Sequence, residues 1–251
     1  MIITAAMAKT ALSLGAFAAL FVAERVRPYT IVKRPAGRTA RNGALILTAL
    51  AASAFIAAPL AVFSAAHPVW RRPDAPWLFV FDFLALDFIA WRLHRAYHEV
   101  DALWRLHQPH HLDRFLDTTT AIRFHALEIV FSALVRAAAI AAFAIPIAHV
   151  AAFEAILFVT AAFYHSNVAL PSRLDSALSR VVVTPSLHWV HHHRKRADTD
   201  SNYGAVLAVW DGLFGFRNEW SRSRDMPVGV EGVEEKPPLG LLLAPFSRDA
   251  R

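Results

Sequence analysis

The sequence contains no cysteine and only three methionines. The absence of thiolates excludes disulfides, iron–sulfur clusters, thiolate-ligated haem and cysteine-based zinc sites. Any metal ion bound by this chain must therefore be held by nitrogen or oxygen atoms. Thirteen histidines are available as nitrogen donors.

Charged residues are also scarce. They make up 18% of the chain, against 56% hydrophobic residues, and a soluble domain of this size rarely has so little polar surface. The composition predicts an integral membrane protein. The net charge of +6 does not indicate a nucleic-acid-binding protein, because lysine and arginine are dispersed between apolar stretches and form no single basic stripe.

Four segments are apolar enough to form membrane helices or a helical hairpin: 1–23, 42–70, 76–93 and 126–165. The segment 42–70 has no charged residue and exceeds the roughly 20 residues that cross a hydrocarbon core. A signal peptide is the alternative for the first segment, but no convincing cleavage site precedes Glu24. The last segment is predicted to fold back near Pro146, with a short second arm or a shallow hairpin as the alternative. The fold class is thus all-α, with about four to five membrane helices.

The distribution of basic residues predicts the orientation of these helices. Six lie in the connection 24–42, and only Arg71 and Arg72 lie in the next one, which places the first connection in the cytoplasm. The stretches 92–125 and 165–251 then lie on the cytoplasmic face as a histidine-rich helical cap. We expect a multi-pass protein of a bacterial inner membrane.

Three histidine clusters have spacings that place their rings on one face of a helix. They are HRAYH with His94 and His98, HQPHH with His107, His110 and His111, and HWVHHH with His188, His191 and His192. In the second cluster, Pro109 is expected only in a first helical turn. In the third, Thr184 is the expected N-cap and Pro185 the first helical residue.

Two single histidines, His125 and His165, stand at the two ends of the predicted hairpin and return to the same membrane level. With the clusters they make ten candidate ligands. One histidine pair alone is often merely solvated, but three clusters at helix ends predict a metal site, and more than six imidazoles predict two ions. Zinc, copper and iron all accept imidazole, and an all-nitrogen binuclear iron site is the best chemical match. The remaining histidines, His67, His149 and His193, are expected at surfaces or interfaces.

The three boxes resemble those of the fatty acid hydroxylase and sterol desaturase superfamily, whose members carry HxxxH followed by two HxxHH motifs. Further similar features are Asp87 before the first box, TAIRFHALE with His125 and Glu128, HSN at 165–167, NYG at 202–204, and WDGLFGF. In some hydroxylases a histidine stands where Ala161 stands here, which leaves one site position unfilled. We expect His125 to supply that ligand.

The resemblance implies a membrane di-iron enzyme with two iron ions and O2 as co-substrate. It would hydroxylate or desaturate a C–H bond of a lipid such as a sterol, a fatty acyl chain or a carotenoid. The implied division of the chain is 1–75 as N-terminal membrane helices, 76–216 as the catalytic domain and 217–251 as a cytoplasmic tail. Residues expected to orient the ligands are Asp87, Glu128, Asn167, Asn202 and Asp211.

No cytochrome or flavin domain fits in the rest of the chain, so a separate electron donor of ferredoxin or cytochrome type is expected. The basic cytoplasmic face would suit an acidic donor. The alternative from another class is a non-catalytic membrane protein that carries haem on two histidines, or that binds or transports a metal. Haem requires a facing pair at mid-helix, whereas these histidines gather at helix ends.

Overall fold

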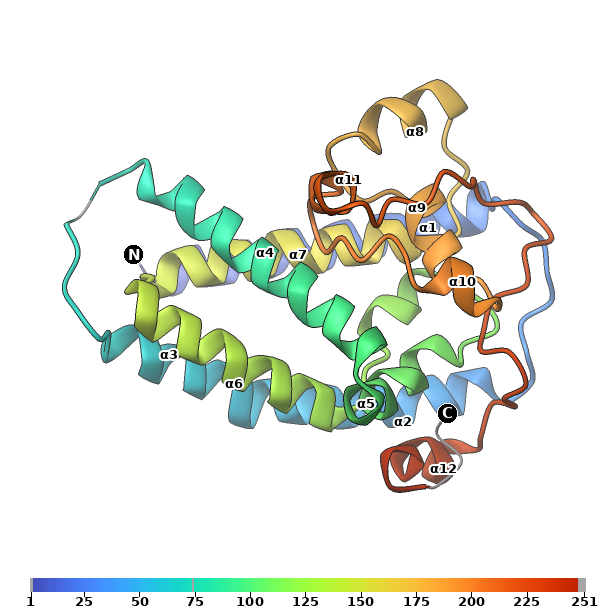
Figure 1. Cartoon of the computed structure of the whole chain (residues 1–251), viewed down its shortest axis with the longest axis horizontal. Coiled ribbons are helices and arrows are strands. Elements are labelled where there is room, and N and C mark those ends of the chain that lie inside the picture. Colours follow the sequence, from blue (N-terminus) through green and yellow to red (C-terminus); the bar gives the residue numbers. More distant parts are fainter. Residues whose placement is uncertain (1, 74, 248–251) are drawn as a thin grey trace.

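The structure is a computed structural model that describes residues 2–73 and 75–247, with side chains from residue 10 onward. All regular elements in these ranges are helices (Figure 1). The long ones are α1 (Ile2–Val26), α4 (Leu78–Glu99), α6 (Ala126–Phe143), α7 (Ile147–His165) and the continuous helix formed by α2 (Arg38–Ala52) and α3 (Ala58–Ala66). The shorter ones are α5 (Asp101–His111), α8 (Ser172–Leu178), α9 (Pro185–His191), α10 (Arg196–Thr199), α11 (Val209–Phe214) and α12 (Pro238–Leu242).

Within the described residues, three helices are long and apolar enough to cross a membrane. They are the continuous helix Arg38–Ala66, which joins α2 to α3 through the π-helical turn Ser53–Ala57, and the two arms α6 and α7. Large apolar side chains are exposed on all three helices, and Phe55 is 82% exposed. Apolar surface of this extent is unfavourable in water and favourable in lipid. The prediction of several membrane helices is therefore confirmed for three segments.

The predicted hairpin is present, but its second arm is not short. The arms have 18 and 19 residues and are joined by the turn 144–146, in which Ala144 has a φ of 53°. Segment 76–93 is part of α4, which is not among the three because it also carries Asp82, Asp87 and Arg92. Residues 2–23 of the first predicted segment lie in α1, and the side chains before residue 10 lie outside the described part.

The long helices run lengthwise and bring their ends together at one end of the molecule. The helix α2–α3 packs along α6, α1 packs along α7, and α4 crosses both arms of the hairpin (Figure 1). Leu86 of α4, Ile140 of α6 and Phe153 of α7 share one buried apolar cluster that fixes this crossing. The C-terminal halves of α4 and α7 thereby reach the shorter helices of the cap.

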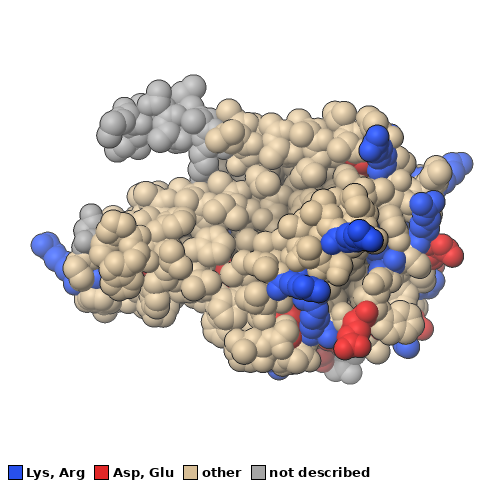
Figure 2. Space-filling view, turned by 90° about the horizontal axis from the view of Figure 1, so that it is seen from above, with Lys and Arg blue, Asp and Glu red and all other residues tan. Residues whose placement is uncertain are grey.

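Charge is distributed unevenly over the surface. On the face drawn in Figure 2, most charged side chains gather over the cap end, and the elongated apolar body carries few. Helix α12 is part of this cap, because its Leu241 packs with Leu45 of α2 and Leu112 in a buried cluster. This part of the predicted segment 217–251 is therefore packed against the helices.

Candidate metal centre

Four helix segments converge on the centre. The last two turns of α4 supply His94 and His98, and α5 supplies His107, His110 and His111. His165 is the last residue of α7. His188 and His191 lie in α9, and His192 is its C-cap. The predicted start of α9 is confirmed, with Thr184 at the N-cap and Pro185 as the first residue.

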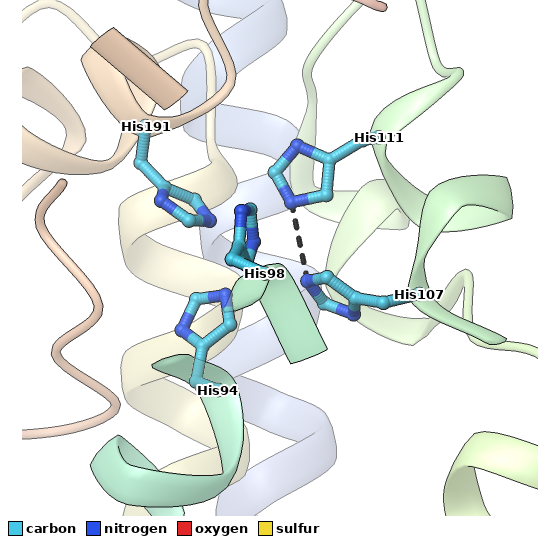
Figure 3. A group of neighbouring side chains, drawn as sticks. All are labelled: His94, His98, His107, His111 and His191. Carbon is cyan, nitrogen blue, oxygen red and sulfur yellow. Dashed lines mark hydrogen bonds between the residues drawn. The ribbon is translucent and has the colours of Figure 1, made fainter. Parts of the chain in front are cut away.

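The rings form two adjacent groups. In the five-histidine group, one ring nitrogen of each member lies within 4.8 Å of the others: His94, His98, His107, His111 and His191. Figure 3 shows these rings turned toward one another. The four-histidine group obeys the same limit and comprises His110, His165, His188 and His192. Nine of the ten predicted ligands are thus brought together, all buried except His94, which is half-buried.

Acceptors behind several rings fix their tautomer. The Nδ1 atoms of His94, His191 and His110 lie 2.9, 2.7 and 3.1 Å from the carbonyl oxygens of Tyr203, Ser201 and Arg123. His165 Nδ1 lies 2.8 Å from the Ala161 carbonyl oxygen. Because a carbonyl only accepts, Nδ1 carries the proton in each of these rings and Nε2 keeps a free lone pair. Metal-binding histidines are generally held in this manner.

The Nε2 atoms face the interior of the groups without ordinary partners. Those of His94, His98 and His191 are buried and lack a hydrogen-bond partner among the described residues. Others approach one another: His111 to His107 at 3.1 Å, His188 to His165 at 3.0 Å and His192 to His188 at 3.1 Å. Neighbouring nitrogen ligands about 2.1 Å from one ion are about 3 Å apart. The donor set therefore fits metal ions.

Burial keeps the rings of the cap helices neutral. It lowers the pKa of His107 to about 3, and it lowers the pKa values of His111 and His188 well below the ordinary value, with smaller contributions from neighbouring rings. The same holds for His110, His191 and His192. Neutral imidazole is the form that binds metal, so the groups are ready to bind at neutral pH.

Comparison with known proteins agrees with the boxes. The family model described as fatty acid hydroxylase matches residues 79–216, which is more than half of the chain. The chain belongs to the fatty acid hydroxylase family. This range contains every box and both histidine groups.

Two kinds of curated relative resemble this chain. Ornithine lipid hydroxylase OlsE of Rhizobium tropici is 30% identical over 255 residues, covering 96% of this chain and 75% of that protein. Alkylglycerol monooxygenases of Homo sapiens and Caenorhabditis elegans are 34% and 33% identical over 142 and 159 residues. The chain spans about a third of these monooxygenases, 31% and 30% of their length. No solved structure matches.

His125 is the one predicted ligand that the structure leaves outside both groups. It is the N-cap of α6, where its Nδ1 accepts the backbone N–H of Leu127 at 3.1 Å. Its Nε2 lies 3.0 Å from the Leu242 carbonyl oxygen. Both nitrogens are thus engaged by backbone, and the expectation that His125 replaces a ligand missing at Ala161 is not supported. The second group has four histidines where the first has five.

Pro109 also departs from expectation, because it lies near the end of α5 and not in its first turn. The helix ends two residues later, so the proline removes only the hydrogen bond that its own nitrogen would donate to the Arg105 carbonyl. The Pro109 carbonyl accepts Arg123 Nε at 3.0 Å. This contact helps to hold the helix end that carries His110 and His111.

Among the residues expected to orient ligands, Glu128 does so directly: its Oε1 lies 2.7 Å from His107 Nδ1. Asp211 acts through the backbone. It accepts the N–H groups of Tyr203 and Gly204, both at 2.9 Å, and so fixes the segment whose Tyr203 carbonyl accepts from His94. Burial raises the pKa of Asp211 to about 6. Asp87 accepts from the Val206 N–H at 2.9 Å and from the Trp210 indole N–H at 2.8 Å. It therefore stabilises the same loop and makes no hydrogen bond to a histidine among the described residues.

The two asparagines stabilise loops. Asn167 accepts from the backbone N–H of Thr30 and donates to its carbonyl, at 3.0 and 2.9 Å, which ties the end of α7 to the segment after α1. Asn202 adopts a φ of 53° and donates to the Leu187 carbonyl at 3.1 Å. Among the histidines expected at surfaces, His193 and His149 pair with Asp198 and Asp82, and His67 is exposed.

Sequence reasoning missed Arg123 and Asp200. Arg123 is fully buried, and its backbone carbonyl accepts from His110 while its side chain holds α5. Asp200 Oδ1 lies 3.3 Å from His98 Nδ1. The position of Arg123 inside the TAIRFHALE stretch was a usable sequence signal. A backbone carbonyl carries no signal, because every residue has one.

A cavity of about 130 Å³ touches both histidine groups. It is lined by His94 and His107 of one group, and by His110, His165 and His188 of the other. Apolar walls come from Leu93, Phe124 and Leu157, and polar ones from Tyr97, Ser132 and Arg136. Because α4, α6 and α7 form much of its wall, the cavity is placed to receive part of a molecule that lies among the long helices.

Proposed function

We propose that this chain is an integral membrane oxygenase that holds two iron ions, one in each histidine group, and hydroxylates a C–H bond of a polar membrane lipid. The observation that carries the proposal is the pair of buried, all-histidine groups on one cavity walled by apolar helices. The names of the relatives support hydroxylation rather than desaturation. A sterol or a carotenoid is less favoured than a glycerol- or amino-acid-based lipid for the same reason.

The chain's own residues would position the reacting carbon and exclude water. When bound, iron would supply the redox chemistry that activates dioxygen, with two electrons from a separate ferredoxin or cytochrome. Leu93, Phe124 and Leu157 would hold hydrocarbon against the rings. Tyr97 is one of the polar groups that line this cavity, and its hydroxyl donates to the Glu128 carbonyl at 3.1 Å, with Ser132 Oγ at 2.7 Å.

We further propose that the cap lies on the cytoplasmic face of a bacterial inner membrane. The six basic residues of the connection 24–42 support this orientation. In this arrangement α1 and α4 cross the membrane beside the three apolar helices, which gives five spans. The catalytic unit would comprise residues 76–216, carried by membrane helices in 1–75, and residues 217–251 would cover its cytoplasmic side.

Metal analysis and labelled dioxygen test this function. Protein purified in detergent should contain about two irons per chain and show no Soret band. His111→Ala and His188→Ala, one from each group, should each lower the iron content to about one. Lipids of expressing cells grown under heavy-isotope O2 should gain a labelled hydroxyl with the wild type and not with either variant.

His193→Ala is the matched control, because His193 neighbours the third box but pairs with Asp198 outside both groups. It should keep both irons and the product. Stoichiometric haem would support the carrier alternative and exclude the proposal. Labelled product from the His188→Ala variant would show that the four-histidine group is not the site.

A further inference from the structure

A second cavity, of about 380 Å³, lies between α8, the start of α9 and the segment 217–222. None of the thirteen histidines lines it. Helix α8 is the short helix at the top of Figure 1. Tyr29 and Leu170 also line this cavity, and they follow the ends of α1 and α7 by a few residues. The cavity is therefore at the level where these helices leave the apolar body.

One wall of the cavity contains a buried arginine, Arg222, with hydrogen-bond donors that lack acceptors within the described part of the chain. Arg222 is 7% exposed, and its Nη2 donates to the Val168 carbonyl at 2.7 Å. Its Nε and Nη1 have no hydrogen-bond partner among the described residues. The guanidinium carbon lies 3.8 Å from the centre of the Tyr29 ring, which holds the group from one side. A buried cation with free donors is costly unless an anion completes its bonding.

Burial lowers the pKa of Arg222 to about 10, with opposing contributions from Asp175 and Tyr29. The side chain stays charged at neutral pH, so the cost of burying it remains. An anionic oxygen in the cavity would offset that cost and take up the free donors.

A buried carboxylate in the same cavity has an oxygen that accepts no hydrogen bond from the described residues. Asp175 is 9% exposed, and its Oδ2 accepts the Ser186 hydroxyl. Its Oδ1 has no partner among the described residues. Arg217 and Glu219 also line the cavity, so its charged walls comprise two cations and two anions. A simple carboxylate, which has no donor, would meet the unpartnered oxygen of Asp175 acceptor against acceptor, whereas a ligand with both signs satisfies both groups.

We propose that this cavity binds a zwitterion whose anionic oxygens accept from Arg222 and whose ammonium donates to Asp175. Five serines provide neutral hydrogen-bonding groups around it: Ser172, Ser176, Ser179, Ser186 and Ser221. The volume lies within the range of about 300–1,000 Å³ that small-molecule sites occupy. The ligand belongs to the class of amino-acid-like groups, either as the head of a membrane lipid or as a free solute. The site is separate from the histidine groups, and its ligand need not be the molecule that is oxidised.

Titration calorimetry on iron-loaded protein in detergent tests the site with three small probes. γ-Aminobutyrate carries both charges, butyrate only the anion and butylamine only the cation. We expect γ-aminobutyrate to bind at least about tenfold more tightly than either. Asp175→Asn, which keeps the side-chain shape, should abolish the preference over butyrate. Arg222→Lys keeps the positive charge but removes Nε and Nη1. It should weaken the binding of both γ-aminobutyrate and butyrate.

Asp225→Asn is the matched control, because Asp225 is an exposed carboxylate just beyond the cavity wall. It should leave all three affinities unchanged. Iron content and melting temperature identify a variant that has merely misfolded. Equal affinity of the wild type for butyrate and γ-aminobutyrate, or no saturable binding of γ-aminobutyrate, would overturn the proposal.

A competition experiment then assigns the source of the ligand. A lipid with an ornithine head in detergent micelles should displace γ-aminobutyrate if the site takes lipid heads, while a diacylglycerol of the same chain length should not. Displacement by free ornithine alone would assign a solute. Binding without any oxidised product would overturn the proposed oxygenase and leave this site standing, so the two failures are distinguishable.

Discussion

The chemistry of the centre depends on which nitrogen of each imidazole carries the proton. A neutral imidazole offers one lone pair, and the acceptor behind Nδ1 decides that Nε2 presents it. At His107 this acceptor is the Glu128 carboxylate, whereas His94 and His191 use backbone carbonyls. A carboxylate also adds negative charge, which strengthens the ring as a ligand. Glu128 is thus the side chain whose replacement isolates this effect.

Glu128→Gln should weaken iron binding by about tenfold or more, because the amide keeps the shape of the side chain and loses its charge. Titration with a chelator that competes for ferrous iron measures the change. Glu99→Gln is the control, since Glu99 is an exposed glutamate that pairs only with Arg95 on the surface of α4. If both variants retain iron equally, the charge of Glu128 does not strengthen iron binding by His107.

The loop after α5 shows how one element positions another. Arg38, in the first turn of α2, reaches Asp113 through Nη2 and Nε at 2.7 and 2.8 Å. It also reaches Asp117 at 3.0 Å, and all three side chains are buried. Asp117 in turn caps the 3₁₀ turn Thr118–Ile122 that leads to Arg123. The N-terminal helices therefore hold the loop that supports the second box.

Arg38→Met should destabilise the protein by about 3–5 kcal/mol, because it removes the buried guanidinium that pairs with both Asp113 and Asp117. Thermal unfolding in detergent, followed by circular dichroism, measures the loss. Arg34→Met is the comparison: Arg34 also pairs with Asp117 at 3.2 Å, but its side chain is 47% exposed, so the cost should stay below about 1 kcal/mol. Equal losses would show that the buried network is not the stabilising feature.

At the scale of the whole molecule, the centre links stability to pH. The folded pKa of His107 is about 3, and those of the other cap histidines are likewise depressed. In the unfolded chain these rings bind protons below about pH 6.5, whereas in the folded chain they do not. The stabilisation is therefore complete above about pH 6.5 and is lost as the pH falls toward 3. Each ring adds up to about 1.4 kcal/mol per pH unit.

Metal-free protein should melt at progressively lower temperature as the pH is reduced from 8 to 5, with the change concentrated below about pH 6.5. Iron-loaded protein should resist this change, because the ion competes with protons for the same lone pairs. Melting curves of both forms over this range provide the test. A melting temperature of the metal-free form that is independent of pH would contradict the depressed pKa values.

Periodicity and composition predicted much of this arrangement. The hairpin turn near Pro146 and the start of α9 at Pro185 follow from local rules of capping and hydrophobicity, and nine of the ten histidines predicted as ligands lie in the two groups. These rules act within one helix, so the sequence alone determines that His94 and His98 share a face. They also determine that any metal ion bound by a chain without cysteine must be held by nitrogen or oxygen atoms.

Only the tertiary structure decided how the ligands divide and what supports them. The division into groups of five and four depends on how α4, α5, α7 and α9 cross, which no local pattern encodes. His125 matched the pattern and was excluded, because a capping position and the Leu242 carbonyl engage both its nitrogens. The acceptors behind His94, His110 and His191 are backbone carbonyls, chemically the same at every residue, so only the fold selects Tyr203, Arg123 and Ser201.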